Sequence, residues 1–99
     1  MRREGLSVST FYDKYPTKAG ANFIAVGWKE FGPGGYQVSV IYGRDDGEKE
    51  QLVRDRRDLV FDNVNDSEIA YKRDCEAAKK QYPHVANASG EIFAELRKA

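Results

Sequence analysis

The hydrophobic rhythm of this 99-residue chain changes along its length. Residues 6–42 alternate between apolar and polar positions, as β-strands do, whereas residues 66–82 carry apolar positions at the spacing of an amphipathic helix. Glycine-centred turns separate the alternating segments. This order predicts an α+β fold: a small antiparallel sheet of three or four strands, followed by an amphipathic helix and a short C-terminal helix.

Three strands are expected at residues 6–12, 22–31 and 36–42. The second has apolar residues on both faces, which predicts a central position in the sheet. The runs Gly32-Pro33-Gly34-Gly35 and Asp45-Asp46-Gly47 supply the residues that tight turns need after the second and third strands.

Residues 48–62 fit two structures. Several good helix formers open the segment, and Leu52, Arg56 and Leu59 lie at helical spacing. The hairpin turn before the segment and its β-prone run at residues 59–61 favour a strand instead. We expect a fourth strand from Lys49, with an irregular stretch over residues 54–58.

The main helix is predicted to begin at Asn65, whose side chain would cap free backbone amides while Glu68 reaches back to complete the cap. Pro83 is expected to end it. Four of its residues form one stripe that should pack on the sheet: Tyr71, Cys75, Ala78 and Tyr82. A last helix over residues 90–98 presents Ile92, Phe93 and Leu96.

Length and composition predict one α+β domain over residues 1–99. Sixteen basic and sixteen acidic residues give a net charge of zero, so long-range attraction to a polyanion is weak. No stretch is long and apolar enough to span a bilayer, so we expect no membrane partner. A single cysteine cannot form an internal disulfide, which favours a cytoplasmic location.

The sequence predicts no catalytic residue, no cofactor and no metal site. His84 follows Pro83, and a solvated loop histidine is expected there. Cys75 falls on the apolar helix stripe, where burial keeps a thiol protonated and unreactive. The acidic residues Asp45, Asp46 and Glu48 lack the ligand spacing of a calcium loop. We therefore expect a protein that is not an enzyme.

Four arginines form the first candidate binding surface: Arg44, Arg54, Arg56 and Arg57. Guanidinium groups bind phosphates and carboxylates bidentately, so this cluster could contact nucleic acid or an acidic protein. Asp55 and Asp58 interleave with the arginines, so we favour a solvated face of mutually paired charges and retain the four arginines as partner-contact candidates.

Two sets of apolar residues could either pack in the core or remain exposed as a binding surface. Trp28, Tyr36 and Tyr42 could stack nucleic-acid bases, but they share a face with valines, which favours core packing. Phe11, Phe23 and Ile41 are expected to form an apolar patch on the other face of the sheet. The last helix, a second copy or a foreign protein could cover that patch. We favour the last helix and retain the three residues as partner-contact candidates.

A non-catalytic protein-binding module is the function we expect. In being short, without cofactor ligands and without catalytic motifs, the chain is similar to small phage-encoded accessory proteins that inhibit host machinery. That resemblance implies an inhibitor of a larger host complex that handles nucleic acid or serves in defence. The alternative is a nucleic-acid-binding domain that uses the arginine cluster and a sheet face. Three strands followed by a helix also occur in the DNA-binding arms of recombinases, although no residue carries over.

Overall fold

The structure is a computed structural model that describes residues 5–13, 21–32, 34–45, 51–86 and 90–97. Its first four elements are strands, and a long helix, a short strand and a short helix follow. Their bounds are β1 Leu6–Tyr12, β2 Ala21–Glu30, β3 Tyr36–Asp45, β4 Gln51–Phe61, α1 Val64–Gln81, β5 His84–Ala86 and α2 Gly90–Arg97.

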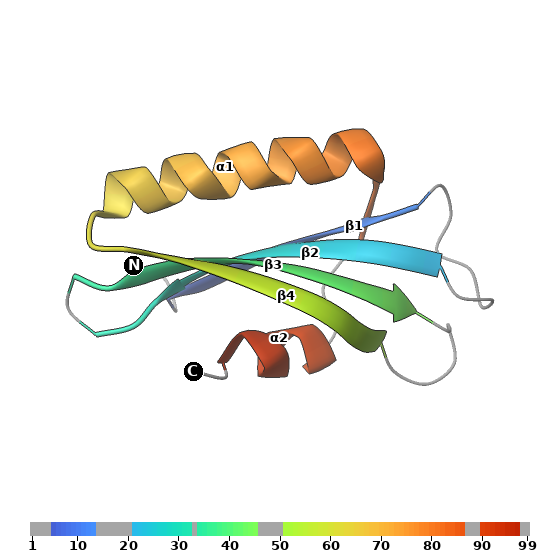
Figure 1. The fold of residues 1–99 in the computed structure, drawn as a ribbon, viewed down its shortest axis with the longest axis horizontal. Coiled ribbons are helices and arrows are strands. Elements are labelled where there is room, and N and C mark those ends of the chain that lie inside the picture. Colours follow the sequence, from blue (N-terminus) through green and yellow to red (C-terminus); the bar gives the residue numbers. More distant parts are fainter. Residues whose placement is uncertain (1–4, 14–20, 33, 46–50, 87–89, 98–99) are drawn as a thin grey trace.

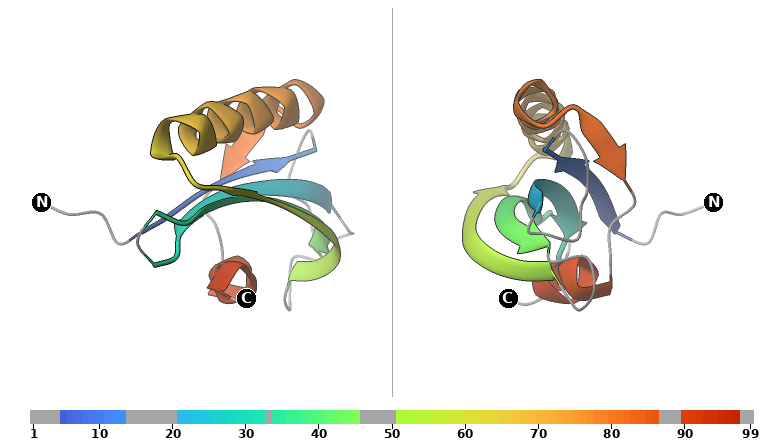
Figure 2. Two further views of the ribbon diagram at one scale, coloured as in Figure 1. Left: turned by 60° about the vertical axis from the view of Figure 1, so that its left-hand side comes forward. Right: turned by 90° about the vertical axis from the view of Figure 1, so that its right-hand side faces the viewer.

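The described strands form one antiparallel sheet of five strands in the order β4-β3-β2-β1-β5. Helix α1 lies on one face of the sheet and α2 lies on the other (Figure 1). The sheet curves so that α2 sits on its concave side (Figure 2). The predicted α+β class is confirmed, and the sheet has five strands rather than the three or four expected.

The core between α1 and the sheet is built from alternate residues of β2 and β3, with Ile24, Val26, Trp28, Val38 and Val40 all buried. The predicted helix stripe packs against them, which confirms its orientation. Because these strand residues recur at every second position, they all lie on the face of the sheet that α1 covers, and Phe11 of β1 joins them there.

Ser67 joins α1 to this core by hydrogen bonds as well as by packing. The Trp28 indole N–H donates to Ser67 Oγ at 2.8 Å, and the Ser67 hydroxyl donates to the Val64 carbonyl at 2.7 Å. Both polar groups are therefore satisfied where water is excluded, since Ser67 is fully buried. This pair fixes the position of α1 over β2.

A second core lies between the sheet and α2. Phe23 and Ile41 from the strands pack with Ile92 and Leu96 from the helix, and all four are buried. Gly27 makes the contact close, because a Cβ at that position would lie 2.6 Å from Leu96 Cδ1. The last helix therefore covers the second face of the sheet, as we favoured.

Residues 51–61, which the sequence allowed to be either helix or strand, form strand β4. It is a continuous strand that pairs with β3, so the irregular stretch expected over residues 54–58 is wrong apart from one position. Tyr42 pairs with Asp55 and Gly43 with Val53, which leaves Arg54 as the extra residue of a β-bulge. Cross-strand pairing with β3 outweighs the helix propensity of the segment.

Helix α1 begins earlier than predicted. Asn63 is the N-cap, and its side-chain oxygen accepts the Asp66 backbone N–H at 3.1 Å. Asn65 instead lies inside the first turn, so its assignment as the cap was wrong. Both asparagines can cap a helix, and the short turn after Phe61 selects the first of them.

The β2–β3 turn forms where it was predicted, whereas His84 lies in a strand. In the β2–β3 hairpin the Phe31 N–H donates to the Gly35 carbonyl at 2.9 Å, which confirms the predicted turn. Asp46 and Gly47 of the second predicted turn lie outside the described residues. His84 belongs to β5, which pairs with β1, and not to the loop that we expected.

Replacing Asn63 with Ala should destabilise the domain by about 1 kcal/mol, because the Asp66 amide loses its acceptor. Asn65→Ala is the matched control, since it removes the same side chain two residues later, and it should change stability by less than about 0.5 kcal/mol. Urea unfolding of both variants measures the difference. An equal effect of the two changes would show that the cap is misplaced.

Candidate functional site

The arginines predicted to form one cluster are divided between the two faces of the sheet. Arg57 pairs with Val40 of β3 and shares its face, under α1. Arg56 pairs with Ile41 and lies on the α2 face. Arg44 and Arg54 occupy β3 and β4, and their side chains lie outside the described part of the structure. Consecutive residues of a strand point to opposite faces, so the expected single cluster is wrong for Arg56 and Arg57.

Arg56 holds α2 against β4. Its Nε donates to Asp58 Oδ1 at 2.9 Å, and its Nη1 donates to the Glu95 carbonyl oxygen and to Glu95 Oε2. The Arg56 side chain is mostly buried by these contacts. The Arg56 side chain therefore links β4 to α2 within its own chain.

The Asp58 carboxylate accepts a hydrogen bond from Arg56, and its environment favours the charged form. Partial burial alone would raise the pKa of Asp58, but hydrogen bonds from Ser39 and Arg56, together with the charges of Arg56 and Lys29, hold it below its ordinary value of 3.8. The Ser39 hydroxyl donates to the same carboxylate oxygen at 2.6 Å. The folded protein thus favours the ionised form of Asp58.

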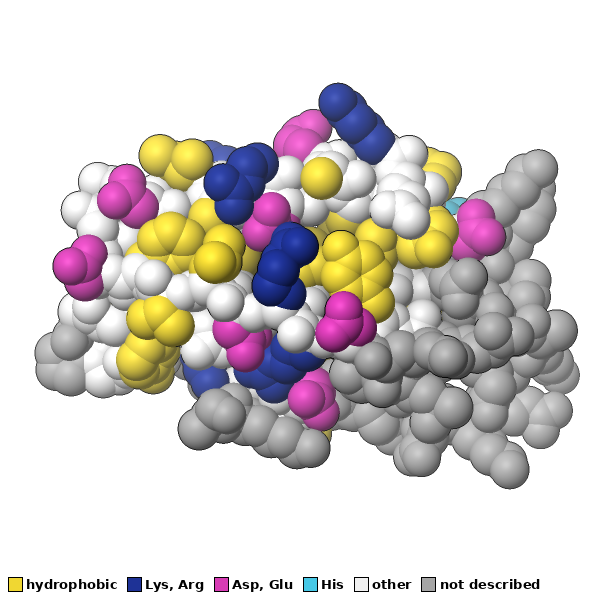
Figure 3. Space-filling view, viewed as in Figure 1, with side chains coloured by type: hydrophobic (Ala, Val, Ile, Leu, Met, Phe, Trp, Pro, Cys, Tyr) yellow, Lys and Arg dark blue, Asp and Glu magenta, His cyan; other side chains and the backbone are white. Residues whose placement is uncertain are grey.

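Arg57 has a different environment. It is exposed, and among the described residues it has no hydrogen-bond or ion-pair partner. It borders a groove of about 60 Å³ between α1 and the sheet, and Asp74 lies in the same groove. The Asp74 carboxylate is mostly buried, and its Oδ2 has no hydrogen-bond partner among the described groups. Hydrophobic side chains form a band between α1 and β4, with charged side chains among them (Figure 3).

The outer edge of β4 is the longest edge in the described sheet, because β5 on the opposite side has three residues. Asp55 Oδ1 accepts the Arg56 backbone N–H at 2.9 Å, which places this amide on the outer edge rather than against β3. Farther along the strand, Leu59 is 41% exposed and Val60 is 66% exposed. An edge strand with exposed apolar residues is a site at which another strand can add.

The apolar patch predicted from Phe11, Phe23 and Ile41 is not present as one surface. Phe23 and Ile41 are buried beneath α2, whereas Phe11 pairs with Ile24 and packs on the α1 side. Tyr12 takes the place that we assigned to Phe11. All three predicted contact residues are buried, so they are not exposed to a partner in this structure.

The sheet-face aromatics are core residues, as the valines on their face indicated. Trp28 is buried and its ring stacks with that of Tyr36, with the centroids 5.9 Å apart. Tyr36 and Tyr42 are half-buried against the same core. These rings therefore do not form an open platform for nucleic-acid bases.

Cys75 and His84 lie on different elements, α1 and β5. Burial raises the pKa of the Cys75 thiol, and hydrogen bonds with Ser9 and Tyr71 offset that rise only in part. A protonated thiol is a weak nucleophile and a weak metal ligand. Within the described ranges, no three His, Cys, Asp or Glu side chains gather as metal ligands would.

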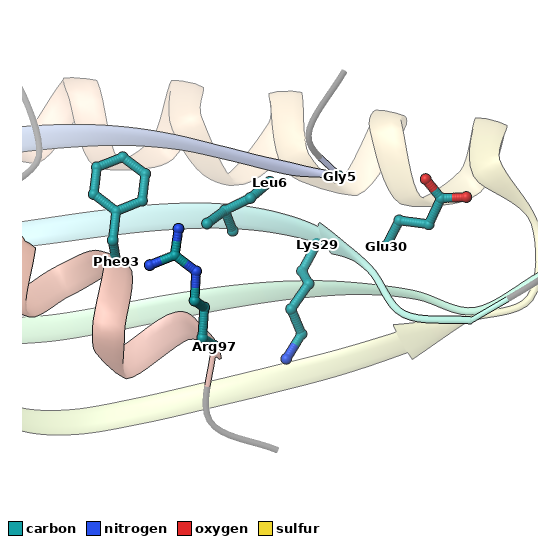
Figure 4. Close-up of a pocket in the computed structure, with 6 residues that line it drawn as sticks. All are labelled: Gly5, Leu6, Lys29, Glu30, Phe93 and Arg97. Atoms are coloured by element: carbon teal, nitrogen blue, oxygen red, sulfur yellow. The ribbon is translucent and has the colours of Figure 1, made fainter. Parts of the chain in front are cut away.

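A larger cavity of about 400 Å³ opens between α2 and the first two strands. Phe93 and Arg97 of α2 face Leu6 of β1 across it, and the Lys29 side chain extends along its other side (Figure 4). The Arg97 guanidinium lies 5.9 Å from the centre of the Phe93 ring, a cation–π distance. The lining combines the apolar Leu6 and Phe93 side chains with two cationic groups, Lys29 and Arg97, and with the Glu30 carboxylate.

Comparison with known protein families, curated proteins and solved structures gives no match for this chain. Neither α1 nor α2, as far as the structure describes them, is long and apolar enough to cross a membrane.

Sequence reasoning missed the open edge of β4. The signal was the run Arg54-Asp55-Arg56-Arg57-Asp58, which we read as an arginine cluster. Charged residues in the middle of a strand are typical of an edge strand, because they discourage uncontrolled pairing. Reading the segment as a strand with two faces would have separated Arg56 from Arg57.

Arg56→Ala should destabilise the protein by about 2 kcal/mol, because Asp58 and Glu95 lose a buried donor. Arg57→Ala removes the neighbouring arginine, which makes no such contact, and should change stability by less than about 0.5 kcal/mol. Amide hydrogen exchange should show that Arg56→Ala weakens protection in α2 more than Arg57→Ala does. Equal protection in the two variants would contradict the assigned role.

The lowered pKa of Asp58 predicts a pH dependence of stability. A carboxylate whose pKa is depressed by folding contributes stability above its unfolded pKa, and that stability is lost as the pH falls through the folded pKa. Wild type should therefore lose more unfolding free energy than Asp58→Asn between pH of about 6 and about 3. Urea midpoints at the two pH values measure this. Parallel losses in the two proteins would show that Asp58 is not a source of the pH dependence.

Proposed function

We propose that this chain is a non-catalytic protein-binding module and that it binds a partner along the outer edge of β4. The observation that carries the proposal is the open edge itself, where Leu59 and Val60 remain exposed beside charged residues. A strand or extended segment of a partner can add to such an edge through backbone hydrogen bonds, while alternate side chains provide specificity.

The surroundings of the edge also favour this binding mode. Helix α1 lies above β4, so a segment added to the edge would place side chains beside the groove that contains Arg57 and Asp74. Exposed apolar residues near the charged groups resemble the apolar centre and polar rim of protein interfaces. In its specific form, the proposal is a small inhibitor, of the kind encoded by phages, that binds a larger host complex.

A nucleic-acid-binding domain is the alternative, and it has less support. Of the described arginines of β4, Arg56 is held by Asp58 and Glu95, which leaves Arg57 for a phosphate. The aromatic rings considered for base stacking belong to the core under α1. A chain with no net charge should bind generic DNA or RNA weakly at physiological salt.

Capture from the source-cell lysate tests the proposal with two matched variants. Val60 on β4 is 66% exposed and Ile69 on α1 is 64% exposed, so Val60→Lys and Ile69→Lys add the same charge at equally accessible positions. Val60→Lys should abolish capture of a specific protein partner, because it alters the binding edge. Ile69→Lys should leave capture at least half as efficient as in wild type.

Treatment of the lysate with nuclease separates the two classes of partner. Capture that survives nuclease and depends on Val60 supports the proposal. Capture that nuclease abolishes, together with affinity for a mixed nucleic-acid pool that falls steeply as salt rises, would favour the nucleic-acid alternative. Equal effects of Val60→Lys and Ile69→Lys would contradict the assignment to β4.

A further inference from the structure

We infer that the β4 edge also binds the same edge of a second copy of this chain. The two strands would pair antiparallel about a two-fold axis that passes between the two Arg56 residues. The inference rests on the proposed function, since both require β4 to accept an added strand. A two-fold interface uses one patch twice, so the patch must complement itself.

The charges of β4 satisfy that condition. With the axis at Arg56, Asp55 lies opposite the partner's Arg57, and Arg57 lies opposite the partner's Asp55. Asp55 and Arg57 both lie on the α1 face of their own strand, because they pair with Tyr42 and Val40 of β3. The two ion pairs therefore form on one face of the joined sheet. Opposite charges at facing positions stabilise antiparallel strands.

The backbone of β4 agrees with the same axis. The Arg56 N–H is on the outer edge, where its own Asp55 carboxylate accepts it. In the dimer the two Arg56 residues would exchange N–H to carbonyl hydrogen bonds, which frees each Asp55 to pair with the partner's Arg57. Hydrogen-bonded and non-hydrogen-bonded pairs alternate along antiparallel strands. Asp55 and the partner's Arg57 would therefore form a non-hydrogen-bonded pair, in which side chains approach more closely. This arrangement gives Arg57 an ion-pair partner, which no described residue of its own chain provides.

Neighbouring registers are unfavourable. An axis at Asp55 would oppose two aspartates, and an axis at Arg57 would oppose two arginines. At Arg56 the facing residues also carry like charges, but Asp58 and Glu95 of the same chain already neutralise each guanidinium. Among the axes that pass through residues 55–57, the ion pairs therefore favour the one at Arg56.

Charge exchange tests the register directly. Asp55→Arg and Arg57→Asp should each weaken self-association about tenfold or more, because each replaces two attractions with two repulsions. The double variant Asp55→Arg/Arg57→Asp restores opposite charges at both positions and should dimerise like wild type. An equimolar mixture of the two single variants should form a heterodimer for the same reason. Sedimentation equilibrium measures each association constant.

Three controls keep the outcome interpretable. Circular dichroism and thermal unfolding establish that each variant is folded. Lys72→Glu reverses a charge at an exposed position of α1 and should leave self-association unchanged. In wild type, the Arg56 amide should exchange more slowly as protein concentration rises. If a single variant does not fold, this concentration dependence of exchange decides the question by itself.

A wild-type chain that stays monomeric at about 1 mM would overturn the inference, as would charge reversal without effect or failure of both rescues. These results are separable from the lysate experiment. A monomer whose capture of a foreign protein depends on Val60 would refute the self-pairing and leave the proposed function standing. A dimer with charge rescue and no Val60-dependent capture would refute binding of a foreign protein at β4 and retain the self-pairing.

Discussion

Burial of β2 on both faces is the constraint on which the rest of the structure depends. Val26 packs toward α1, and Phe23 and Ala25 pack toward α2, so neither face of the central strand can be left to water. Two helices must therefore cover one sheet, and the chain has to supply them from its C-terminal half. Strand β4 forms one edge of the described sheet in this arrangement.

The parts of the fold that the sequence predicted are those with a strong local period. Alternation identified β1, β2 and β3, and the helical stripe from Tyr71 to Tyr82 identified the buried side of α1. The face of Phe11 was predicted wrongly because β1 carries small or aromatic residues at successive positions, so its contrast between faces is weak. That face is fixed by the pairing of Phe11 with Ile24, which is a long-range property.

The candidate site was harder to predict for the same physical reason. A run of charges gives no hydrophobic period, and the different roles of Arg56 and Arg57 depend on whether Glu95 lies within reach of the strand. Short β5 pairs with β1 across a large sequence separation, and three residues carry no reliable pattern. Charge on β4 therefore has two consequences: it keeps unrelated strands away and it restricts which partner can match the edge.

The hydrogen bond from Trp28 to Ser67 makes the fluorescence of Trp28 sensitive to the position of α1. Trp28 is the one tryptophan in the chain, and it is buried in the seam between the sheet and α1. Separation of α1 from the sheet would hydrate the indole, so its emission maximum should move to longer wavelength. The α2 layer contains tyrosine and phenylalanine on its side of the sheet. Tryptophan fluorescence therefore follows the departure of one helix from the sheet without contribution from the other.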